Sequence, residues 1–281
     1  MSNEVVYKSN ALIQACYRLS VQEQRIILSA ISQVRRDCTP TDEVMYSVSA
    51  QTLSELTGSS VKHTYQEIKK AALRLKRREI WIKENPNGEG LKANTMVTGW
   101  VQTISYIDSE GRVELRFNKD ILPYLTELQS QFTSYRLKNV IQMTSSYGIR
   151  FYELLIQWKG KQLLELEIEW LKEAFQIQDS YPRISDFKKW VLEPALKDIN
   201  NNSDLQVSYT QRKTGRKITH LIFKIKSQKV SKKDKEAKAP VHSPDLPPIT
   251  KPEPNRSERT KSAKDVALKA LEQMKLGLTD A

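Results

Sequence analysis

The pattern of apolar and polar positions is most regular between residues 187 and 225. Apolar residues recur at helical spacing from Phe187 to Ile199, which predicts an amphipathic helix with Ser185 as its N-cap. Pro194 lies inside this helix and removes a backbone hydrogen bond, so we expect a kink there. After a polar break, apolar residues alternate over 205–209 and again over 221–225, as they do in strands. The stretch therefore predicts a helix followed by a β-hairpin.

Positive charge lies on both parts of this unit. Lys188 and Lys189 fall off the apolar stripe near the start of the helix. Gly215 lies between the two strands and can adopt the positive φ that a tight turn requires. The turn carries four cations: Arg212, Lys213, Arg216 and Lys217. A helix with a basic start before a hairpin with a basic tip is the layout of a winged helix, which places the helix in the major groove. The alternative is a solvated helix and a solvated loop.

The first half of the chain begins with the same order of elements. Ser20 and Glu23 have the spacing of a capping box and predict the start of a helix. A short strand is expected over 46–48. Ser49 can cap a second helix, which Gly58 ends. The first ten residues are expected to be loose, with an edge strand at 5–7 as an alternative.

A basic helix and three strands complete this half. Ser59 or Ser60 is expected to cap the helix, whose apolar residues recur from Tyr65 to Leu75. The polar residues predicted to face outward near its start are Lys62, His63, Thr64, Gln66 and Lys69. The strands are expected over 80–82, 96–107 and 112–117, and the turn 108–111 between the last two is acidic.

The second half repeats the order: a helix over 146–158, a short strand over 164–168 and a helix over 170–175 precede the basic helix and its hairpin. Each half thus reads helix, short strand, helix, turn, basic helix, hairpin. We predict an α+β fold with two tandem winged-helix domains, 1–137 and 138–228, joined by a connector at 132–140. Residues 229–281 are rich in Lys, Pro and Ser and are predicted to be a disordered tail, with a short amphipathic helix over 264–276.

Composition narrows the class of partner. The chain has 281 residues and a formal net charge of +12, which favours an anionic partner. No apolar run is long enough to span a bilayer and the N-terminus lacks the pattern of a signal peptide, so we expect a cytoplasmic protein with no membrane partner. Cys16 and Cys38 are then expected to be free thiols. The five tryptophans are expected to anchor the cores.

Catalytic patterns are missing from the sequence. Gly160-Lys161 lacks the earlier glycine of a phosphate-binding loop. The three histidines, His63, His220 and His242, have no metal-ligand spacing. The alternating Glu165, Glu167 and Glu169 are interpreted as a solvated strand face, with divalent-metal binding as the alternative. We expect no catalytic residue, no metal and no cofactor.

Three stretches carry a resemblance to a known family. They are LSVQEQRIILSAIS at 19–32, FTSYRLKNVIQMTSSYGIRFYELLIQW at 132–158, and SDFKKWVLEPALKDINNNSDLQVSY with KTGRKITHLIFKI at 185–225. The chain resembles the initiator replication proteins of theta-replicating, iteron-containing bacterial plasmids, the Rep or RepB family, from about residue 5 to 226. Where that family often has an arginine-rich run at the start of the second recognition helix, this chain has Lys188-Lys189-Trp190. Lysine offers a point charge where arginine offers a bidentate fork.

The resemblance implies two winged helices that bind directly repeated iterons and open the origin with host factors, such as the host initiator, helicase and chaperones. It also implies repression of the protein's own promoter by a homodimer that binds an inverted repeat and is in equilibrium with the monomer. The first-domain sheet, with its acidic turn, is expected to carry the dimer contact. The alternatives are a plain winged-helix transcriptional repressor, a rolling-circle nicking enzyme, or a scaffold that contacts only proteins.

The predicted interface with double-stranded DNA has three parts. The first-domain helix contributes Ser60, Lys62, His63, Thr64 and Lys69. The second-domain groove contacts are Arg183, Ser185, Lys188 and Lys189. The second-domain wing holds phosphates through Arg212, Lys213, Arg216 and Lys217.

Overall fold

The computed structural model describes residues 4–35, 41–88 and 95–228. These residues belong to one compact unit, and their buried apolar side chains form a single cluster drawn from both halves. Cys38, the predicted tail at 229–281 and its predicted helix over 264–276 lie outside the described residues. Along the described ranges, no helix combines the length and the apolar character needed to cross a membrane.

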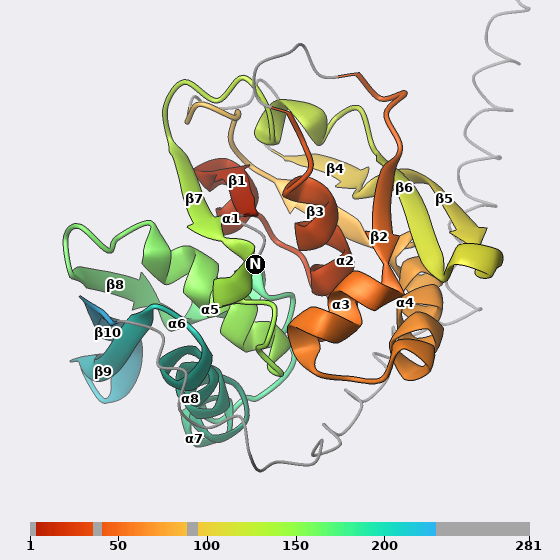
Figure 1. Ribbon diagram of the computed structural model, residues 1–281. Coiled ribbons are helices and arrows are strands. Elements are labelled where there is room, and N and C mark those ends of the chain that lie inside the picture. The colour runs from red at the N-terminus through yellow and green to blue at the C-terminus, as the bar shows by residue number, and fades with distance from the viewer. Residues whose placement is uncertain (1–3, 36–40, 89–94, 229–281) are drawn as a thin grey trace, which may run out of the picture. The chain divides into compact units, whose positions relative to one another are not determined.

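The first half contains a winged-helix unit (Figure 1). Its elements in chain order are α2 (Val21–Ile31), β2 (Tyr46–Ser49), α3 (Ala50–Thr57), α4 (Val61–Leu75), β5 (Val101–Ile107) and β6 (Arg112–Phe117). The sheet order is β2-β6-β5, with antiparallel neighbours. Both hydrogen bonds of the predicted capping box are present, between Ser20 and Glu23. Gly58 ends α3 with a φ of 77°.

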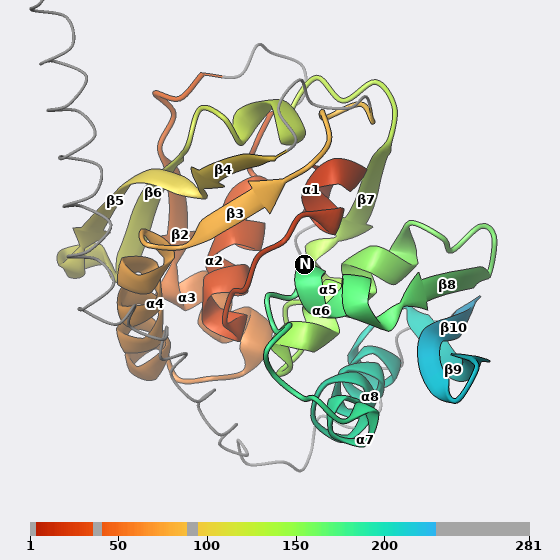
Figure 2. The same ribbon diagram turned by 180° about the vertical axis from the view of Figure 1, so that it is seen from behind.

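Further elements extend this unit. The hairpin β3 (Glu79–Ile82) and β4 (Met96–Gly99) is inserted between α4 and β5 (Figure 2). The predicted strand at 96–107 is therefore two strands, β4 and β5, which are interrupted at Trp100. The remaining elements are β1 (Val5–Ser9), α1 (Asn10–Gln14), β7 (Phe132–Arg136) and three short 3-10 helices, η1 (Asp108–Glu110), η2 (Leu122–Tyr124) and η3 (Leu137–Asn139).

Two predictions about the ends of the first half need correction. Residues 5–9 are not loose: they form β1, which pairs antiparallel with β7, with Val6 opposite Tyr135, so the edge-strand alternative at 5–7 is confirmed. The predicted connector at 132–140 contains β7 and is therefore a paired strand rather than a simple linker. No local pattern indicated the pairing of β1 with β7, because the two strands lie more than a hundred residues apart along the chain.

The second half repeats the winged-helix order. Its elements are α5 (Ser146–Ile156), β8 (Leu163–Glu167), α6 (Ile168–Ala174), α7 (Ile184–Phe187), the π-helical turn η4 (Lys188–Leu192), α8 (Glu193–Asn202), β9 (Leu205–Thr214) and β10 (Lys217–Ser227). The sheet order is β8-β10-β9, which corresponds strand for strand to β2-β6-β5 of the first half. The tandem winged-helix prediction is confirmed.

The helix that carries the second basic surface is not a regular α-helix. Pro194 has no N–H, so the carbonyl of Trp190 loses its α-helical donor. The N–H of Glu193 instead donates to the carbonyl of Lys188, five residues earlier, which is the bond of a π-helical turn. The kink expected at Pro194 is therefore a π-turn over 188–192. Ser185 is not the N-cap, because Arg183 occupies that position and its carbonyl accepts the N–H of Phe187.

The tryptophans divide between core and surface. Trp100 is fully buried, and Tyr17 packs edge-on against it with ring centroids 4.9 Å apart. Trp81 and Trp190 are 46% and 57% exposed, so the prediction that all five anchor the cores is wrong for these two. Trp81 lies between buried Ile80 and Ile82, and Trp190 lies between exposed Lys189 and buried Val191. Both therefore occupy outward-facing positions, Trp81 on a strand and Trp190 on a helix, which a count of tryptophans alone does not show.

Candidate nucleic-acid interface

The start of α4 presents polar side chains to solvent. Ser60 occupies the N-cap position without a capping hydrogen bond from its side chain, and Lys62 and His63 are exposed. Thr64 is buried, which contradicts its predicted outward position. It lies four residues before Ile68 and therefore falls on the same inward stripe of the helix. No hydrogen-bond partner exists for its hydroxyl within the described structure.

The wing of the first half folds back onto this helix. The wing tip is η1 at the turn between β5 and β6, and α4 lies beside it in both views (Figures 1 and 2). Lys69 Nζ lies 2.8 Å from Asp108 Oδ1 and 5.3 Å from the centroid of the Tyr106 ring. The hydroxyl of Tyr65 also donates to Asp108. The acidic tip thus binds a cation of its own helix.

The contact at the first wing tip shifts the pKa values of Asp108 and Tyr65. The hydrogen bonds from Lys69 and Tyr65 lower the pKa of Asp108, so this carboxylate stays charged. Desolvation and the hydrogen bond to Asp108 raise the pKa of Tyr65 to about 12. Lys69 was predicted as a DNA contact, and its ammonium would have to exchange Asp108 for a phosphate to act as one.

The two lysines of the second basic helix point in different directions. Lys188 is half-buried, and its Nζ lies 3.5 Å from Gln211 Oε1 and 5.7 Å from the centroid of the Tyr209 ring, both on β9. Lys189 is exposed, and its Nζ lies 4.7 Å from the centroid of the Trp190 ring. Arg183 and Ser185 are exposed at the start of the same helix. The helix therefore has one lysine facing the wing and one facing solvent.

The wing of the second half is basic and open. The side chains of Lys213, Arg216 and Lys217 are exposed and make no hydrogen bond or ion pair with any other described residue. Gly215 has a φ of 61°, as the two-residue turn at the tip requires. Arg212 differs from the prediction, because its Nε pairs with the carboxylate of Glu165 on β8. The tip therefore offers three unpaired cations instead of four.

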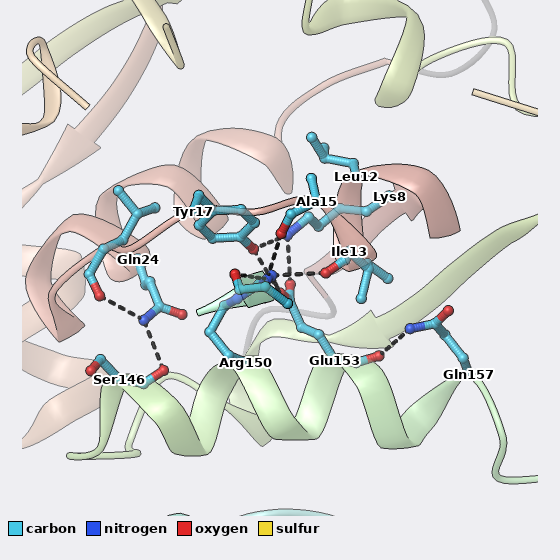
Figure 3. Close-up of polar contacts among 12 residues, drawn as sticks. Lys8, Leu12, Ile13, Ala15, Tyr17, Gln24, Ser146, Arg150, Glu153 and Gln157 are labelled. Atoms are coloured by element: carbon cyan, nitrogen blue, oxygen red, sulfur yellow. Dashed lines mark hydrogen bonds and ion pairs between the residues drawn. The ribbon is translucent and has the colours of Figure 1, made fainter. Parts of the chain in front are cut away.

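A buried polar cluster ties the N-terminal segment to α5 (Figure 3). Lys8 Nζ lies 2.8 Å from Glu153 Oε1, and both side chains are 1% exposed. The hydroxyl of Tyr17 donates to the other oxygen of Glu153, at 3.2 Å. Arg150, in the same helix as Glu153, donates to the carbonyl oxygens of Ile13 and Ala15, each at 2.8 Å. These contacts join segments that lie more than 130 residues apart.

The single carboxylate of this cluster, Glu153, lies between two cations, Lys8 and Arg150. Burial opposes a charge on Glu153, but Lys8 and Arg150 beside it together hold the pKa of that carboxyl below its usual value. Burial, with the neighbouring Glu153 charge, raises the pKa of Tyr135 well above its usual value, so its hydroxyl stays protonated. Sequence reasoning missed this cluster. The available signal was Glu153 itself, an acid four residues after Ile149 on the inward face of a helix.

No metal centre accompanies these features. Across 4–35, 41–88 and 95–228 there is no group of three or more His, Cys, Asp or Glu side chains that could hold an ion. His63 is exposed on α4, and the ring of His220 is half-buried beside the hydroxyl of Thr219 at 2.9 Å. The carboxylate of Glu165 forms an ion pair with Arg212.

Comparison with known proteins identifies the two units. Residues 5–156 match the family described as "Initiator Replication protein, WH1", and residues 167–225 match "Initiator Rep protein, WH2". A replication initiation protein from Escherichia coli is 28% identical over 232 residues, which are 80% of this chain and 70% of that protein. The PI protein from Escherichia coli is 28% identical over 141 residues, which are 44% of this chain and 46% of that protein.

A solved structure shares the fold. The crystal structure of the Pi initiator protein in complex with iteron DNA superimposes with a TM-score of 0.66, at 21% identity, over 81% of this chain and 99% of that one. This likeness concerns the fold, whereas the matched models concern the family. The chain belongs to the family of plasmid initiator replication proteins, which are DNA-binding proteins and not enzymes, and it carries both the WH1 and the WH2 unit of that family.

Proposed function

We propose that this protein initiates plasmid replication by binding iterons, the direct repeats of the origin, with both winged helices of one chain. The observation that carries the proposal is the second wing, where Lys213, Arg216 and Lys217 are exposed without partners beside a helix that begins with exposed Arg183. Unpaired cations on a wing can neutralise phosphates at no cost in broken ion pairs. The structurally similar Pi initiator is described in complex with iteron DNA, which supports the same ligand here.

The predicted contact residues have different roles in the proposed DNA binding. In the second winged helix, Arg183, Ser185, Lys188 and Lys189 would face the groove, and the three wing cations would hold the backbone. Arg212 would act through Glu165, by fixing the wing against β8. In the first winged helix, Ser60, Lys62 and His63 would contact DNA. Thr64 is buried and Lys69 is held by Asp108, so we assign neither a primary contact.

The spacing of the two readers sets the size of the site. Two recognition helices on one face of B-DNA enter major grooves roughly 34–36 Å apart, one helical turn. A monomer should therefore cover about two turns of duplex, which suits one direct repeat. The linked second reader benefits from a high effective concentration, so the chain should bind more tightly than either half.

An origin-dependent replication assay tests the proposal. A plasmid that carries the gene and its upstream DNA, but no other origin, should replicate in a bacterial host. The triple variant K213A/R216A/K217A should abolish replication, while L163A, at an exposed apolar position of β8, should not. A protein that footprints the upstream DNA but never supports replication would be a plain repressor. Relaxation of supercoiled plasmid by the purified protein with divalent metal would indicate a nicking enzyme instead.

Autorepression by a dimer forms a second part of the proposal. The β3-β4 hairpin of the first half, a two-stranded sheet separate from β2-β6-β5, has an exposed apolar pair, Trp81 on β3 opposite Val97 on β4, which are 46% and 51% exposed. Such a pair suits a contact between two copies in the dimer that binds an operator. Val97→Asp should lower the dimer fraction in sedimentation and relieve repression of a promoter reporter, while iteron binding persists. A V97D protein that still dimerises like the wild type would exclude the β3-β4 hairpin as the contact.

We expect the protein to act on plasmid DNA in the bacterial cytoplasm with the host initiator, helicase and chaperones. Pull-down of the host helicase by the intact protein on origin DNA, against the same protein on scrambled DNA, measures this directly.

A further inference from the structure

Trp190 is a large apolar side chain on the outer face of the second recognition helix. It is 57% exposed, while Phe187, Val191 and Leu192 around it are fully buried. The π-turn over 188–192 adds a residue to this part of the helix and shifts the side chains that follow relative to a regular helix. The indole is therefore presented outward because its neighbours, and not Trp190, fill the core.

The surroundings of Trp190 match a DNA-facing surface. The ammonium of Lys189 lies 4.7 Å from the centroid of the indole ring, a cation–π distance. Lys188, in the same turn, extends toward the wing, where its Nζ contacts the side chain of Gln211 on β9. The indole thus sits beside one solvent-facing cation and next to a second that points at the wing. An anionic ligand drawn to these cations would come into contact with the ring.

The chemistry of an indole limits what it can recognise in a groove. Trp offers an apolar face and one N–H donor, and it has no acceptor. The apolar feature on the base edges of the major groove is the 5-methyl group of thymine. Arginine and lysine in such a place favour guanine, so a tryptophan changes the base that is preferred.

We propose that Trp190 is a specificity-determining residue that reads a thymine 5-methyl group in the major groove. The proposal rests on the proposed function, because it requires the second winged helix to bind DNA with this helix in the groove. Lys189 holds the ring from one side and supplies charge to the adjacent phosphate. The indole supplies apolar contact area that lysine alone does not offer.

The test removes the methyl group from the DNA and the indole from the protein. A duplex is first selected from a random pool by the intact wild-type chain. Each thymine is then replaced singly by uracil, which lacks only the methyl group. Wild-type protein should lose about fourfold in affinity at one or two positions, the size expected for one methyl group. W190A should bind the selected duplex less tightly and should show no further loss at those positions.

Two further variants keep the result decisive. W190F retains an apolar ring and should keep most of the uracil effect. L163A removes an equally exposed apolar side chain, 57% for each residue, from β8 and should leave the uracil pattern unchanged. Circular dichroism of every variant confirms folding, and W190S takes the place of W190A in the same series if the W190A chain does not fold.

Three results would overturn the proposal. The first is an identical uracil pattern in wild type, W190F and W190A. The second is a loss for W190A that is equal on the selected and on random duplexes, which would make Trp190 a backbone contact. The third is a wild-type pattern with no sensitive thymine. Failure of the wild type to select any duplex is a different result and would count against the proposed function itself.

Discussion

The two winged helices share a sheet order but carry opposite wings. In the first, the tip begins with Asp108, which binds Lys69 of the recognition helix. In the second, the tip carries Lys213, Arg216 and Lys217, which are unpaired among the described residues. The same fold therefore produces one wing whose acidic tip binds a lysine of its own recognition helix, and one wing whose cations are open to phosphate.

The difference teaches that a fold repeat does not imply a functional repeat. A wing can act on DNA only where its cations have no better partner in the protein. The first winged helix keeps exposed Lys62 and His63 on α4 but has no basic wing, so its contribution should come from the helix alone. The second should supply most of the phosphate contacts.

The largest expected effect is the loss of stability when the buried ion pair between Lys8 and Glu153, which joins the two halves, is broken. Glu153→Gln removes the partner of buried Lys8 and should destabilise the protein by about 3–5 kcal/mol, because a buried charge is left unpaired. Glu173→Gln at the exposed pair with Lys83 is the control and should change stability by less than about 1 kcal/mol. Urea denaturation of both variants measures the difference.

The pH dependence of this pair has a defined sign. The pKa of Glu153 is lowered in the folded state, so its contribution is present above the unfolded pKa of about 4.3 and is lost as pH falls through the folded pKa. Wild-type stability should therefore drop more than that of E153Q between pH 7 and pH 3. Parallel pH profiles would show that the pair is not the link between the halves.

The next effect concerns the open wing. K213A/R216A/K217A should reduce the slope of log affinity against log salt by about 2.7, at roughly 0.9 per phosphate contact. K62A, a single exposed lysine of the first helix, should reduce the slope by about 0.9. Fluorescence anisotropy over a salt series gives both slopes. Equal slopes for the wing variant and the wild type would remove the wing from the interface.

A smaller effect concerns base reading by the second helix. Lys188→Ala should reduce affinity for the selected duplex by about 1–3 kcal/mol if it reads a base, and by much less for random duplex. Because Lys188 also contacts Gln211, the Q211A variant separates loss of wing support from loss of a base contact. Equal losses on both duplexes would reassign Lys188 to a phosphate.

The smallest effect concerns the closed wing. Asp108→Asn removes the charge that holds Lys69, so affinity for random duplex should rise slightly, because an exposed ion pair contributes little. Glu110→Gln, at the same tip but paired with Arg112, is the matched control and should change less. Weaker binding by D108N would mean that the acidic tip helps the first helix to bind DNA.

Most of the secondary structure followed from local patterns. The capping box at Ser20 and the glycine that ends α3 act over a few residues, and the sequence displayed them directly. The pairing of β1 with β7 and the contacts of Lys8 with Glu153 join residues far apart, so no local period indicated them. The basic wing was visible because its charges cluster in sequence, whereas the pairing of Arg212 with Glu165 requires the β8-β10-β9 order.

The boundary between the predicted domains illustrates the same limit. Residue 138 begins the predicted second domain, yet Arg150 and Glu153 of α5 rely on Ile13, Ala15 and Lys8. A fragment of residues 138–228 would expose or orphan these buried charges. Experiments that measure what each winged helix contributes to DNA binding should therefore use the intact chain with substitutions, and not isolated halves.

A hydroxyl-radical footprint of the intact protein on its selected duplex tests the central claim most directly. The account predicts two protected regions about one helical turn apart. K213A/R216A/K217A should lose protection in one region, and K62A/H63A should weaken the other. A single protected region, or the loss of the same region in both variants, would contradict the claim that one chain carries two unequal readers.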